Sequence, residues 1–598
     1  MRLCAKPVVY KPKICELYPV KLTAEQTAII QSTGNITINA VAGSGKTTTL
    51  VAYAAARPGS RILYLAFNRS VKLEAEKKFA EKGLANVQVE TAHSLAYKYI
   101  VRGSRYTVKP EGGYKTQEVA AILGLNAASQ KHQEYVLANH INKYVTYFCN
   151  SSKAKVQELD YAEVVAGVQA QQFVANFSGD ILGGTRQLLA KMDAADIAVT
   201  HDFYLKKFQQ LKPQLPYDFI LFDEGQDASE AMLDVFLHQH STKVIVGDTH
   251  QQIYGWRYAV NSLNKAAYPA YNLSSSFRFD NEIASLASRV LQWKNHFSAQ
   301  PPVVINGYGN GTAIVTRAVV ARTNASLLVK AIELLIEKQQ VQKVYFEGRF
   351  ETYTYADEGA SIYDVLNLYL GNRAYIKDPL VAAMADMAEL EEYIEKTEDN
   401  QLGLIADVVK KYGEKLPAYI KKIKESHLAN DGKTSADMIF STVHRCKGME
   451  YDEVTLTNDF TTEEKVKKQA AEGGGNPLAM QKLAEEINLL YVAVTRTKNI
   501  LNIPAELLPA SKINAIAAVA EEVGEEPPPK RKFNALDDIK NVKSNARAPW
   551  TEEDDALLVD LFCKRLPFRQ IARQLGRSVG MVAERVEALE LRDLYNIY

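Results

Sequence analysis

Short apolar segments alternate with longer segments of helical composition over most of the chain. Residues 35–40 alternate apolar and polar side chains, as a half-buried strand does, and after a glycine-containing break the chain resumes with good helix formers. Four later segments are also predicted strands: residues 61–67, 87–91, 217–222 and 243–247. Each predicted strand is followed by polar residues, and open α/β sheets bind ligands beyond the carboxyl ends of their strands. The pattern predicts an α/β fold with its chemistry along one sheet edge.

The remaining segments set the organisation of the chain. Residues 96–214 have mostly helical composition with polar loops and no obvious chemistry, which favours a structural subdomain. Further helical stretches lie around residues 381–395 and 404–424. Residues 1–21 are a short strap dotted with proline and lysine. Residues 506–545 combine glutamates, three consecutive prolines and a basic triplet, a composition typical of a linker.

Length and composition limit the possible classes of protein. At 598 residues the chain exceeds the usual size of one hydrophobic core, so roughly three to five domains are expected. A net charge of +1 decides nothing about nucleic acid, whose binding needs only a local basic surface. The five cysteines lack metal-site spacing and are interpreted as free thiols in a reducing compartment. Because no run of 18 apolar residues and no apolar leader occurs, we expect a soluble, intracellular protein with no membrane partner.

The strongest chemical signal is the glycine-containing loop between the first predicted strand and the helix after it. Gly43 and Gly45 let the backbone curl so that successive N–H groups face a phosphate, and the helix adds the positive end of its dipole. Lys46 is then placed to reach the β- and γ-phosphates, and the Thr47 hydroxyl to ligate Mg²⁺. Ala40 replaces the first glycine of the usual pattern and is small enough to keep the approach close. The segment predicts a site for ATP with Mg²⁺.

Two further stretches supply groups that a nucleotide hydrolase needs. A short apolar strand ends in Asp223 and Glu224, which are suited to hold Mg²⁺ and to orient and deprotonate the attacking water. A later strand leads to Gln251, which is suited to contact a γ-phosphate. Gln26, upstream of the glycine-containing loop, fits two roles equally well. It is either the partner of Thr23 in a helix capping box or an amide that reads an adenine edge.

A group of aromatic and basic residues follows Gln251. Tyr254, Trp256 and Arg257 combine rings with a cation. Stacking on such rings is worth roughly 1–3 kcal/mol per base and tolerates any base sequence, which suits a protein that moves along a single strand. Core packing of Trp256 is the alternative interpretation.

In chain order these motifs resemble those of the UvrD/Rep-like superfamily 1 DNA helicases, and more closely the helicase portion of the F-box DNA helicases. The resemblance covers roughly residues 20–505. It depends on the following segments: Gln26, 42–47 (AGSGKT), 66–68 (AFN), 91–94 (TAHS), 223–227 (DEGQD), 247–251 (GDTHQ), 276–278 (SFR), 321–324 (ARTN), 442–451 (TVHRCKGMEY) and 486–496 (EINLLYVAVTR).

The resemblance implies roles for individual residues. Phe277 would stack on adenine, Arg278 would touch the γ-phosphate, Glu450 would bind the nucleotide sugar, and Arg496 would be the arginine finger. The implied catalytic set is Lys46, Glu224, Gln251, Arg278 and Arg496. The implied nucleotide-binding set is Gln26, Ala42, Gly43, Ser44, Gly45, Lys46, Thr47, Thr48, Phe277 and Glu450, with Thr47 and Asp223 on the metal. The predicted DNA-binding set is Phe67, Asn68, His93, Tyr254, Trp256, Arg257 and His444, to which the basic C-terminal tail adds Arg577.

Because Arg278 and Arg496 lie far from Lys46 in sequence, a second lobe must bring them to the phosphate. We expect two RecA-like P-loop lobes of α/β class with mostly helical inserted subdomains. Lobe 1A comprises residues 1–95 and 215–272 with insertion 1B at 96–214, and lobe 2A comprises 273–345 and 435–505 with a reduced insertion 2B at 346–434. The 21 residues before Leu22 are too few for an F-box, so the ubiquitin-ligase role of the eukaryotic relatives is expected to be absent.

Residues 546–594 form a predicted small all-α module that resembles a Myb/SANT-like helix-turn-helix. Thr551 can cap a helix with an acidic first turn. From Lys564 to Arg585 there are six basic residues and one acid, Glu584. DNA binding is therefore favoured over protein docking for this module, and Trp550 is expected in its core.

The expected function is that of an ATP- and Mg²⁺-dependent 3′–5′ DNA helicase and single-stranded-DNA translocase in DNA repair or recombination, with the polarity implied by the resemblance alone. Its partners would be single-stranded DNA, junctions or tailed duplex, and duplex DNA through the C-terminal module. One alternative is a translocase that strips proteins from single strands with little unwinding, which the reduced insertion favours. Another is a DNA-binding regulator with a vestigial ATPase, which intact Lys46, Glu224 and Arg496 oppose. The expected location is a bacterial or phage-type cytoplasm, or the nucleus of a eukaryote.

Overall fold

The computed structural model describes residues 22–509 and 550–586, apart from residues 111–112, 126–131, 300, 310, 312, 357–358, 429, 474, 564–567, 576, 578–580 and 583–584. The chain divides into two compact units, Met1–Asn514 and Ala515–Tyr598, and each is described here by itself. The predicted strap at residues 1–21 and nearly all of the predicted linker lie outside the described residues.

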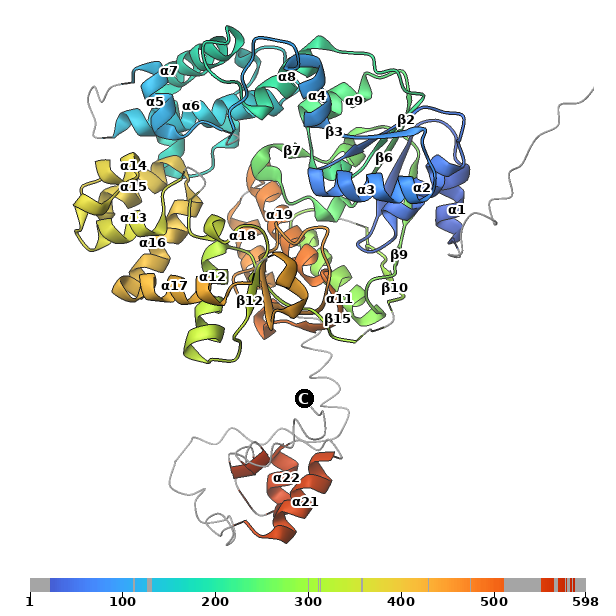
Figure 1. Cartoon of the computed structure of the whole chain (residues 1–598), viewed down its shortest axis with the longest axis vertical. Coiled ribbons are helices and arrows are strands. Elements are labelled where there is room, and N and C mark those ends of the chain that lie inside the picture. The colour runs from blue at the N-terminus through green and yellow to red at the C-terminus, as the bar shows by residue number, and fades with distance from the viewer. Residues whose placement is uncertain are drawn as a thin grey trace, which may run out of the picture. The chain divides into compact units, whose positions relative to one another are not determined.

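The first sheet of the larger unit has six parallel strands in the order β3-β2-β4-β6-β1-β8 (Figure 1). The strands are β1 (Ile36–Ala40), β2 (Ile62–Ala66), β3 (Val87–Thr91), β4 (Phe219–Phe222), β6 (Thr242–Gly247) and β8 (Ala270–Leu273). Five of them are the segments predicted from the apolar pattern. Because all neighbours are parallel, the carboxyl ends of the strands share one edge, where the polar loops after β1, β4 and β6 meet.

The second sheet has five strands in the order β12-β13-β11-β14-β15, again with every neighbouring pair parallel. The strands are β11 (Arg317–Ala321), β12 (Val344–Phe346), β13 (Met438–Thr442), β14 (Tyr451–Leu456) and β15 (Thr497–Asn502). Two short pairs complete the strands: β5 (Ala228–Ser229) with β7 (Ala259–Val260), and β9 (Ser275–Ser276) with β10 (Asn306–Gly307). The predicted α/β class with parallel sheets is confirmed.

Helices cover the sheets and form two insertions. Those beside the first sheet are α1 (Ala24–Gln31), α2 (Lys46–Ala55), α3 (Arg69–Glu81), α4 (Ala92–Ile100), α9 (Glu230–Leu237) and α10 (Ser262–Lys265). The first insertion holds α5 (Thr116–Leu123), α6 (Gln133–Asn150), α7 (Val168–Asp193) and α8 (His201–Leu211). Those beside the second sheet are α11 (Asn281–Gln292), α12 (Asn324–Ile332), α18 (Glu463–Glu472) and α19 (Pro477–Val494). The second insertion holds α13 (Ile362–Tyr369), α14 (Pro379–Ala383), α15 (Met387–Thr397), α16 (Asn400–Tyr412) and α17 (Leu416–Ser426). Within the described ranges, none of these helices is long and apolar enough to span a bilayer.

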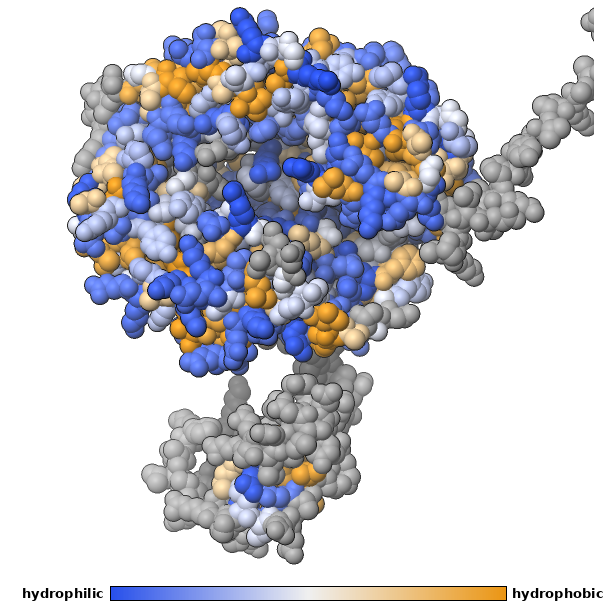
Figure 2. Space-filling model, viewed as in Figure 1, coloured by the Kyte–Doolittle hydropathy of each residue, from blue (hydrophilic) through white to orange (hydrophobic). Residues whose placement is uncertain are grey.

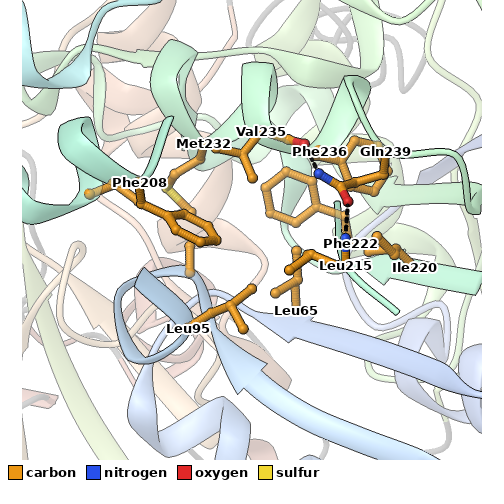
Figure 3. A pocket seen from close by; sticks show the side chains of 12 residues that line it. Leu65, Leu95, Phe208, Leu215, Ile220, Phe222, Met232, Val235, Phe236 and Gln239 are labelled. Carbon is orange, nitrogen blue, oxygen red and sulfur yellow. Dashed lines mark hydrogen bonds between the residues drawn. The ribbon is translucent and has the colours of Figure 1, made fainter. Parts of the chain in front are cut away.

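Each sheet is buried between two apolar clusters, as parallel sheets require. One face of the first sheet packs on α2 and α3, and the other packs on α4, α8, α9 and the first insertion. The second sheet packs on α11 and α19 on one face and on α12 and the second insertion on the other. A cavity of about 20 Å³ remains in the core between the first sheet and helices α4, α8 and α9, lined by apolar side chains and by Gln239 (Figure 3). It is too small and too apolar to supply a binding site.

The two insertions contact each other in the larger unit. Figure 1 shows α14 and α15 beside α5, α6 and α7. The N–H of Gly167, just before α7, donates to Oε1 of Glu398 at 2.7 Å, and His140 Nε2 lies 3.1 Å from the carbonyl of Lys396. Apolar side chains of α6 and α7, Val136 and Phe173, also join the core of the second insertion. The face drawn in Figure 2 is hollowed near its centre, with mostly hydrophilic side chains around the hollow.

The smaller unit is helical where it is described, with α21 (Glu552–Cys563) packed on α22 (Phe568–Leu575). Thr551 caps α21 by accepting the N–H of Asp554 at 3.2 Å, as predicted. Trp550 packs against the apolar cluster of the unit, which agrees with its expected core position.

Candidate active site

The phosphate-binding loop predicted from the sequence connects β1 to α2. Gly43 and Gly45 have φ of 74° and 77°, in the left-handed region that other residues rarely adopt. A Cβ at Gly43 would lie 2.7 Å from Cβ of Arg278 and from Oγ of Ser276. The N–H of Phe277 donates to the carbonyl of Gly43 at 2.9 Å. The segment around β9 therefore packs directly on this loop and brings Phe277 and Arg278 to it.

Other residues of the loop differ in exposure. Ala42 is buried, Thr47 is half-buried and Thr48 is exposed. The hydroxyl of Ser44 is buried and has no hydrogen-bond partner within the described part of the chain. An orphaned hydroxyl and two left-handed glycines make this loop a good fit for the oxygen atoms of a phosphate.

Lys46, the first residue of α2, forms an ion pair with Glu224 at 2.5 Å. The two side chains are only 15% and 18% exposed. Burial acts to lower the pKa of Lys46, but the charges of Glu224 and Asp223 outweigh it and raise the pKa above its ordinary value. Lys46 is therefore a fixed cation at the mouth of the loop.

The pKa values of the two acids after β4 shift in opposite directions. Burial raises the pKa of Asp223, and the neighbouring charge of Glu224 adds to that effect. Burial acts in the same direction on Glu224, but Lys46 and Lys447 outweigh it and hold its pKa low. Glu224 is thus ionised at neutral pH, the state that a general base requires. Asp223 accepts a hydrogen bond from Tyr64 and is a buried carboxylate that a cation would stabilise.

Gln251 lies in the turn after β6 (Thr249–Gln251, η5). Its Nε2 donates to Oδ2 of Asp248 at 2.8 Å, and the hydroxyl of Tyr491 donates to the same oxygen at 2.9 Å. Lys447 donates to the carbonyl of Gln251 at 2.7 Å and forms an ion pair with Asp227. Residues from both sheets therefore hold this turn.

Two guanidinium groups from later in the chain lie beside the loop, Arg278 just after β9 and Arg496 just before β15 of the second sheet. Nε of Arg278 donates to Glu450 at 2.9 Å, and Nη1 donates to the carbonyl of Thr495 at 3.0 Å. Arg496 is 1% exposed and donates to two main-chain carbonyls, at 2.8 and 3.1 Å. Burial lowers the pKa of Arg496 to about 10, and the nearby charge of Arg278 adds to the effect. Neither carbonyl carries a full negative charge, so the guanidinium of Arg496 is suited to receive an anion.

The two residues predicted to contact adenine, Gln26 and Phe277, have defined neighbours in the structure. Gln26 forms the capping box with Thr23, and its Nε2 also donates to Thr49 at 3.2 Å. The predicted cap is therefore present, and the adenine contact of Gln26 stays a prediction. Phe277 is 50% exposed, and its ring lies 6.4 Å from that of Tyr308 with an interplanar angle of 30°. This exposed aromatic pair adjoins the phosphate-binding loop.

A second aromatic group gathers side chains from three distant segments. The ring of Tyr254 stacks on Phe67 at 5.4 Å, and it lies 5.9 Å from His444 and 6.5 Å from Trp256. Trp256 is 57% exposed, so it does not pack in the core. The Arg257 guanidinium lies 4.6 Å from the ring centre of Trp256. Five of the residues predicted to bind DNA are therefore neighbours.

The other three predicted DNA contacts lie elsewhere or already have structural partners. Asn68 caps α3 by accepting the N–H of Val71 at 2.9 Å. His93 lies 3.7 Å from Asp202 on α8. The Arg577 side chain is 1% exposed, pairs with Asp554 at 2.6 Å and lies over the ring of Trp550. The structure thus makes Arg577 a core residue of its unit, where the sequence predicted a surface contact, because basic spacing does not reveal an acidic partner on the preceding helix.

Several site residues were missed by sequence reasoning. Tyr64 reads as an apolar strand position, and only its contact with Asp223 gives it a role. Asp248, Lys447 and Tyr491 occur inside the quoted motifs, where they had no assigned function, yet all three bond to the site from different segments. Among the residues that the structure describes, no group of three or more histidine, cysteine or acidic side chains could hold a metal ion by itself.

Comparisons with known proteins agree with the resemblance. Residues 22–272 match the family described as UvrD/REP helicase N-terminal domain. The chain is 28% identical to F-box DNA helicase 1 of Gallus gallus over 512 residues, which is 81% of this chain and 49% of that protein. It is 27% identical to F-box DNA helicase protein 1 of Schizosaccharomyces pombe, covering 80% of this chain and 56% of that protein. It is 25% identical to ATP-dependent DNA helicase PcrA of Leuconostoc citreum, covering 55% and 46%. The chain spans about half the length of the curated relatives it matches.

Proposed function

We propose that this chain, whose residues 22–272 match the UvrD/REP helicase N-terminal domain, is an ATP-dependent DNA helicase that moves along single-stranded DNA. The observation that carries the proposal is the meeting of Lys46 and Glu224 at the edge of the first sheet with the buried guanidinium of Arg496 from the second. In this proposal residues 1–95 with 215–272 and residues 273–345 with 435–505 are two RecA-like lobes. Residues 96–214 and 346–434 are their insertions.

ATP would lie with its phosphates on the loop at residues 42–47 and its base near Phe277. Thr47 and Asp223 would hold Mg²⁺, which neutralises charge on the β- and γ-oxygens when it is bound. Glu224 would orient and deprotonate the attacking water, since it is ionised. Arg278 and Arg496 would stabilise the charge that develops on the transferred phosphoryl group. An arginine finger is commonly worth roughly 10³–10⁵ in rate, so the approach of the two lobes would control hydrolysis.

Single-stranded DNA would bind at the aromatic group formed by Phe67, Tyr254, Trp256 and His444, with Arg257 as a cation. Movement in the 3′–5′ direction, tailed duplexes or junctions as substrates, and a role in DNA repair or recombination follow from the kind of helicase that the chain resembles. The named relatives come from bacteria and from eukaryotes, so we place the protein in the cytoplasm of the former or the nucleus of the latter.

The first experiment measures ATP hydrolysis with and without single-stranded DNA, for the wild type and for Lys46→Ala. The same preparations are assayed for unwinding of 3′-tailed and 5′-tailed duplexes. We expect strong stimulation by DNA, unwinding of the 3′-tailed duplex alone, and no hydrolysis by Lys46→Ala, since the phosphate-binding cation is lost. Hydrolysis that DNA does not stimulate would refute the proposal.

A second candidate function is a translocase that displaces proteins from single strands and unwinds poorly. The short second insertion, five helices between Ile362 and Ser426, favours it. Stimulation by DNA without unwinding of either duplex, together with displacement of a protein bound to the single strand, would identify this function.

A further inference from the structure

Helix α19 contacts the segment at residues 248–255 through three hydrogen bonds. The hydroxyl of Tyr491 donates to Oδ2 of Asp248 at 2.9 Å. Nδ2 of Asn488 donates to the carbonyl of Gln252 at 2.8 Å. The N–H of Gly255 donates to Oε1 of Glu485 at 3.0 Å. Helix α19 covers the second sheet, while the segment at residues 248–255 follows β6 of the first, so each bond joins the two sheets' layers.

The spacing of these residues makes one continuous contact. Positions 485, 488 and 491 are three apart and lie on one face of α19. Their partners are met in the opposite order, at positions 255, 252 and 248. The helix and the segment therefore run antiparallel, and the three bonds form a ladder, by which we mean the pairs Glu485–Gly255, Asn488–Gln252 and Tyr491–Asp248.

One end of the ladder touches the nucleotide site. Oδ2 of Asp248 accepts both the hydroxyl of Tyr491 and the amide of Gln251, the candidate γ-phosphate contact. Arg496 lies two residues beyond the end of α19 and donates to the carbonyl of Val492 on that helix at 2.8 Å. Any movement of α19 relative to β6 thus changes the distance between Gln251, the candidate γ-phosphate contact, and Arg496, the candidate arginine finger.

The other end touches the aromatic group that is proposed to bind DNA. Gly255 immediately precedes Trp256 in the turn Gly255–Arg257 (η6). A Cβ at Gly255 would lie 2.4 Å from Oε2 of Glu485, so the carboxylate packs directly against this glycine and would have to move if a Cβ were added. Glu485 holds the main chain of the Trp256 turn directly.

The middle bond is buttressed from another element. Nζ of Lys294, in the turn Trp293–His296 (η7), donates to Oδ1 of Asn488 at 2.6 Å and lies 3.1 Å from Nδ1 of His250. Lys294 is 8% exposed and Asn488 is 4% exposed. The Asn488 amide is therefore fixed at both its oxygen and its nitrogen, so the middle of the ladder is rigid.

We propose that Glu485, Asn488 and Tyr491 are positioning residues that couple single-stranded DNA at Trp256 to the placement of Gln251 and Arg496 at the nucleotide. The proposal rests on the proposed function and adds the route by which DNA stimulates hydrolysis. Binding at one end biases the position of α19, and the rigid ladder carries that bias to the other end, with no residue of the ladder touching the reacting atoms. Linkage requires the effect to be reciprocal, so nucleotide also changes the affinity for DNA through the same contacts.

The test uses three variants of the DNA-side pair in the full chain. Glu485→Ala removes the acceptor, and Gly255→Ala keeps the main-chain N–H but displaces the flexible carboxylate. Glu485→Gln keeps an oxygen that accepts the same N–H. We expect the two alanine variants to lose about tenfold in the ratio of ATPase kcat with DNA to kcat without DNA, the effect of one buried hydrogen bond. Glu485→Gln should keep the wild-type ratio, and the basal rate and KM for ATP should stay within about twofold in all three.

Glu486→Ala is the matched control. Glu486 is the next residue on the same helix, and its carboxylate pairs with Arg322 at 2.8 Å, a residue that follows β11 in the same sheet layer as α19. Its loss removes a carboxylate and its ion pair from the same helix without touching the segment at residues 248–255. We expect the DNA stimulation ratio of Glu486→Ala to equal that of the wild type. An equal loss in Glu485→Ala and Glu486→Ala would overturn the ladder in favour of general softening of α19.

A second readout does not depend on stimulation by DNA. Trp256 becomes the sole tryptophan of the three in the chain when Trp293 and Trp550 are both replaced by phenylalanine. Binding of a non-hydrolysable ATP analogue without DNA should then change the Trp256 emission, and Glu485→Ala should abolish that change. If the wild type hydrolyses ATP without responding to DNA while this signal persists, the proposed function fails and the ladder stands. If the emission change survives in Glu485→Ala, the ladder is refuted.

Discussion

Replacing Trp256 by alanine tests the single-strand surface most directly. The indole is 57% exposed, and its described ring contacts are with Tyr254, at 6.5 Å, and the Arg257 guanidinium, at 4.6 Å. Because the side chain buries little apolar area, its removal should change the free energy of unfolding by less than about 1 kcal/mol. The fold, the Tyr254–Phe67 stack and the phosphate-binding loop should remain intact. The variant therefore isolates the contribution of the indole to ligand binding.

The size of the binding effect follows from the exposed ring. Stacking of one base on an aromatic side chain contributes about 1–3 kcal/mol, which corresponds to roughly a 5- to 150-fold change in Kd. The indole is 57% exposed with the Arg257 guanidinium beside it, and the neighbouring rings of Tyr254 and Phe67 cannot replace it because they are stacked on each other. We expect the Kd for an oligo-dT strand to rise within that range. Nucleotide affinity should stay the same, because Lys46 and the loop glycines are unaffected.

The assay is fluorescence anisotropy of a labelled oligo-dT at fixed salt, with a fluorescent ATP analogue titrated in parallel. Salt is held constant because phosphate contacts make single-strand affinity strongly salt-dependent. Tyr375→Ala is the control, since Tyr375 is 72% exposed on the second insertion and outside the aromatic group. A Kd for Trp256→Ala that matches those of the wild type and of Tyr375→Ala would show that this aromatic group does not bind the strand.

Two further outcomes concern stability. Gln239→Leu should lower the free energy of unfolding, measured by urea denaturation, by about 1–3 kcal/mol. The change removes the hydrogen-bond partner of the Pro213 and Val235 carbonyls and of the Leu215 N–H, beside the apolar cavity (Figure 3). An unchanged urea midpoint would show that these three hydrogen bonds of Gln239 do not stabilise the fold. Burial raises the pKa of Glu485 from 4.5 to about 7, so its contribution to stability is present below pH 4.5 and is lost as the pH rises through 7. Glu485→Gln should therefore have a higher Tm than the wild type at pH 8 but not at pH 4.5. An equal difference in Tm at the two pH values would refute the raised pKa of Glu485.

Much of the fold could be predicted from the sequence because its signals are local. The strands at Ile36–Ala40 and Thr242–Gly247 are apolar runs with polar exits, and the capping box of Thr23 and Gln26 is a four-residue pattern. The strand β8, Ala270–Leu273, was not predicted, because its exposed and half-buried residues lack an apolar run. Edge strands of this kind are stabilised by pairing with a neighbour, here β1, and not by their own composition.

The site was predictable to the extent that its chemistry is contained in short motifs. The pairing of Lys46 with Glu224 required only that the carboxyl ends of β1 and β4 share an edge. The contact of the Tyr64 hydroxyl with Asp223 could not be predicted, because a tyrosine in a buried strand has the same sequence pattern whether or not its hydroxyl has a partner. The prediction for Arg577 was wrong for a related reason. A basic residue among other basic residues has the sequence pattern of a surface position, and only the structure shows its partner, Asp554.

The ladder shows the limit of sequence reasoning most clearly. The sequence of residues 485–491 indicates only part of an amphipathic helix, and that of residues 248–255 indicates only a polar loop with a glycine. Neither pattern indicates a contact with the other, because that contact depends on how two segments more than 200 residues apart in sequence come together. What can be argued in retrospect is the need for such a contact. A hydrolase whose arginine finger arrives on a helix of one lobe, and whose γ-phosphate sensor sits on a turn of the other, must hold that helix and that turn in register. A polar contact between them does so while remaining sensitive to any ligand, such as DNA at Trp256, that binds at its far end.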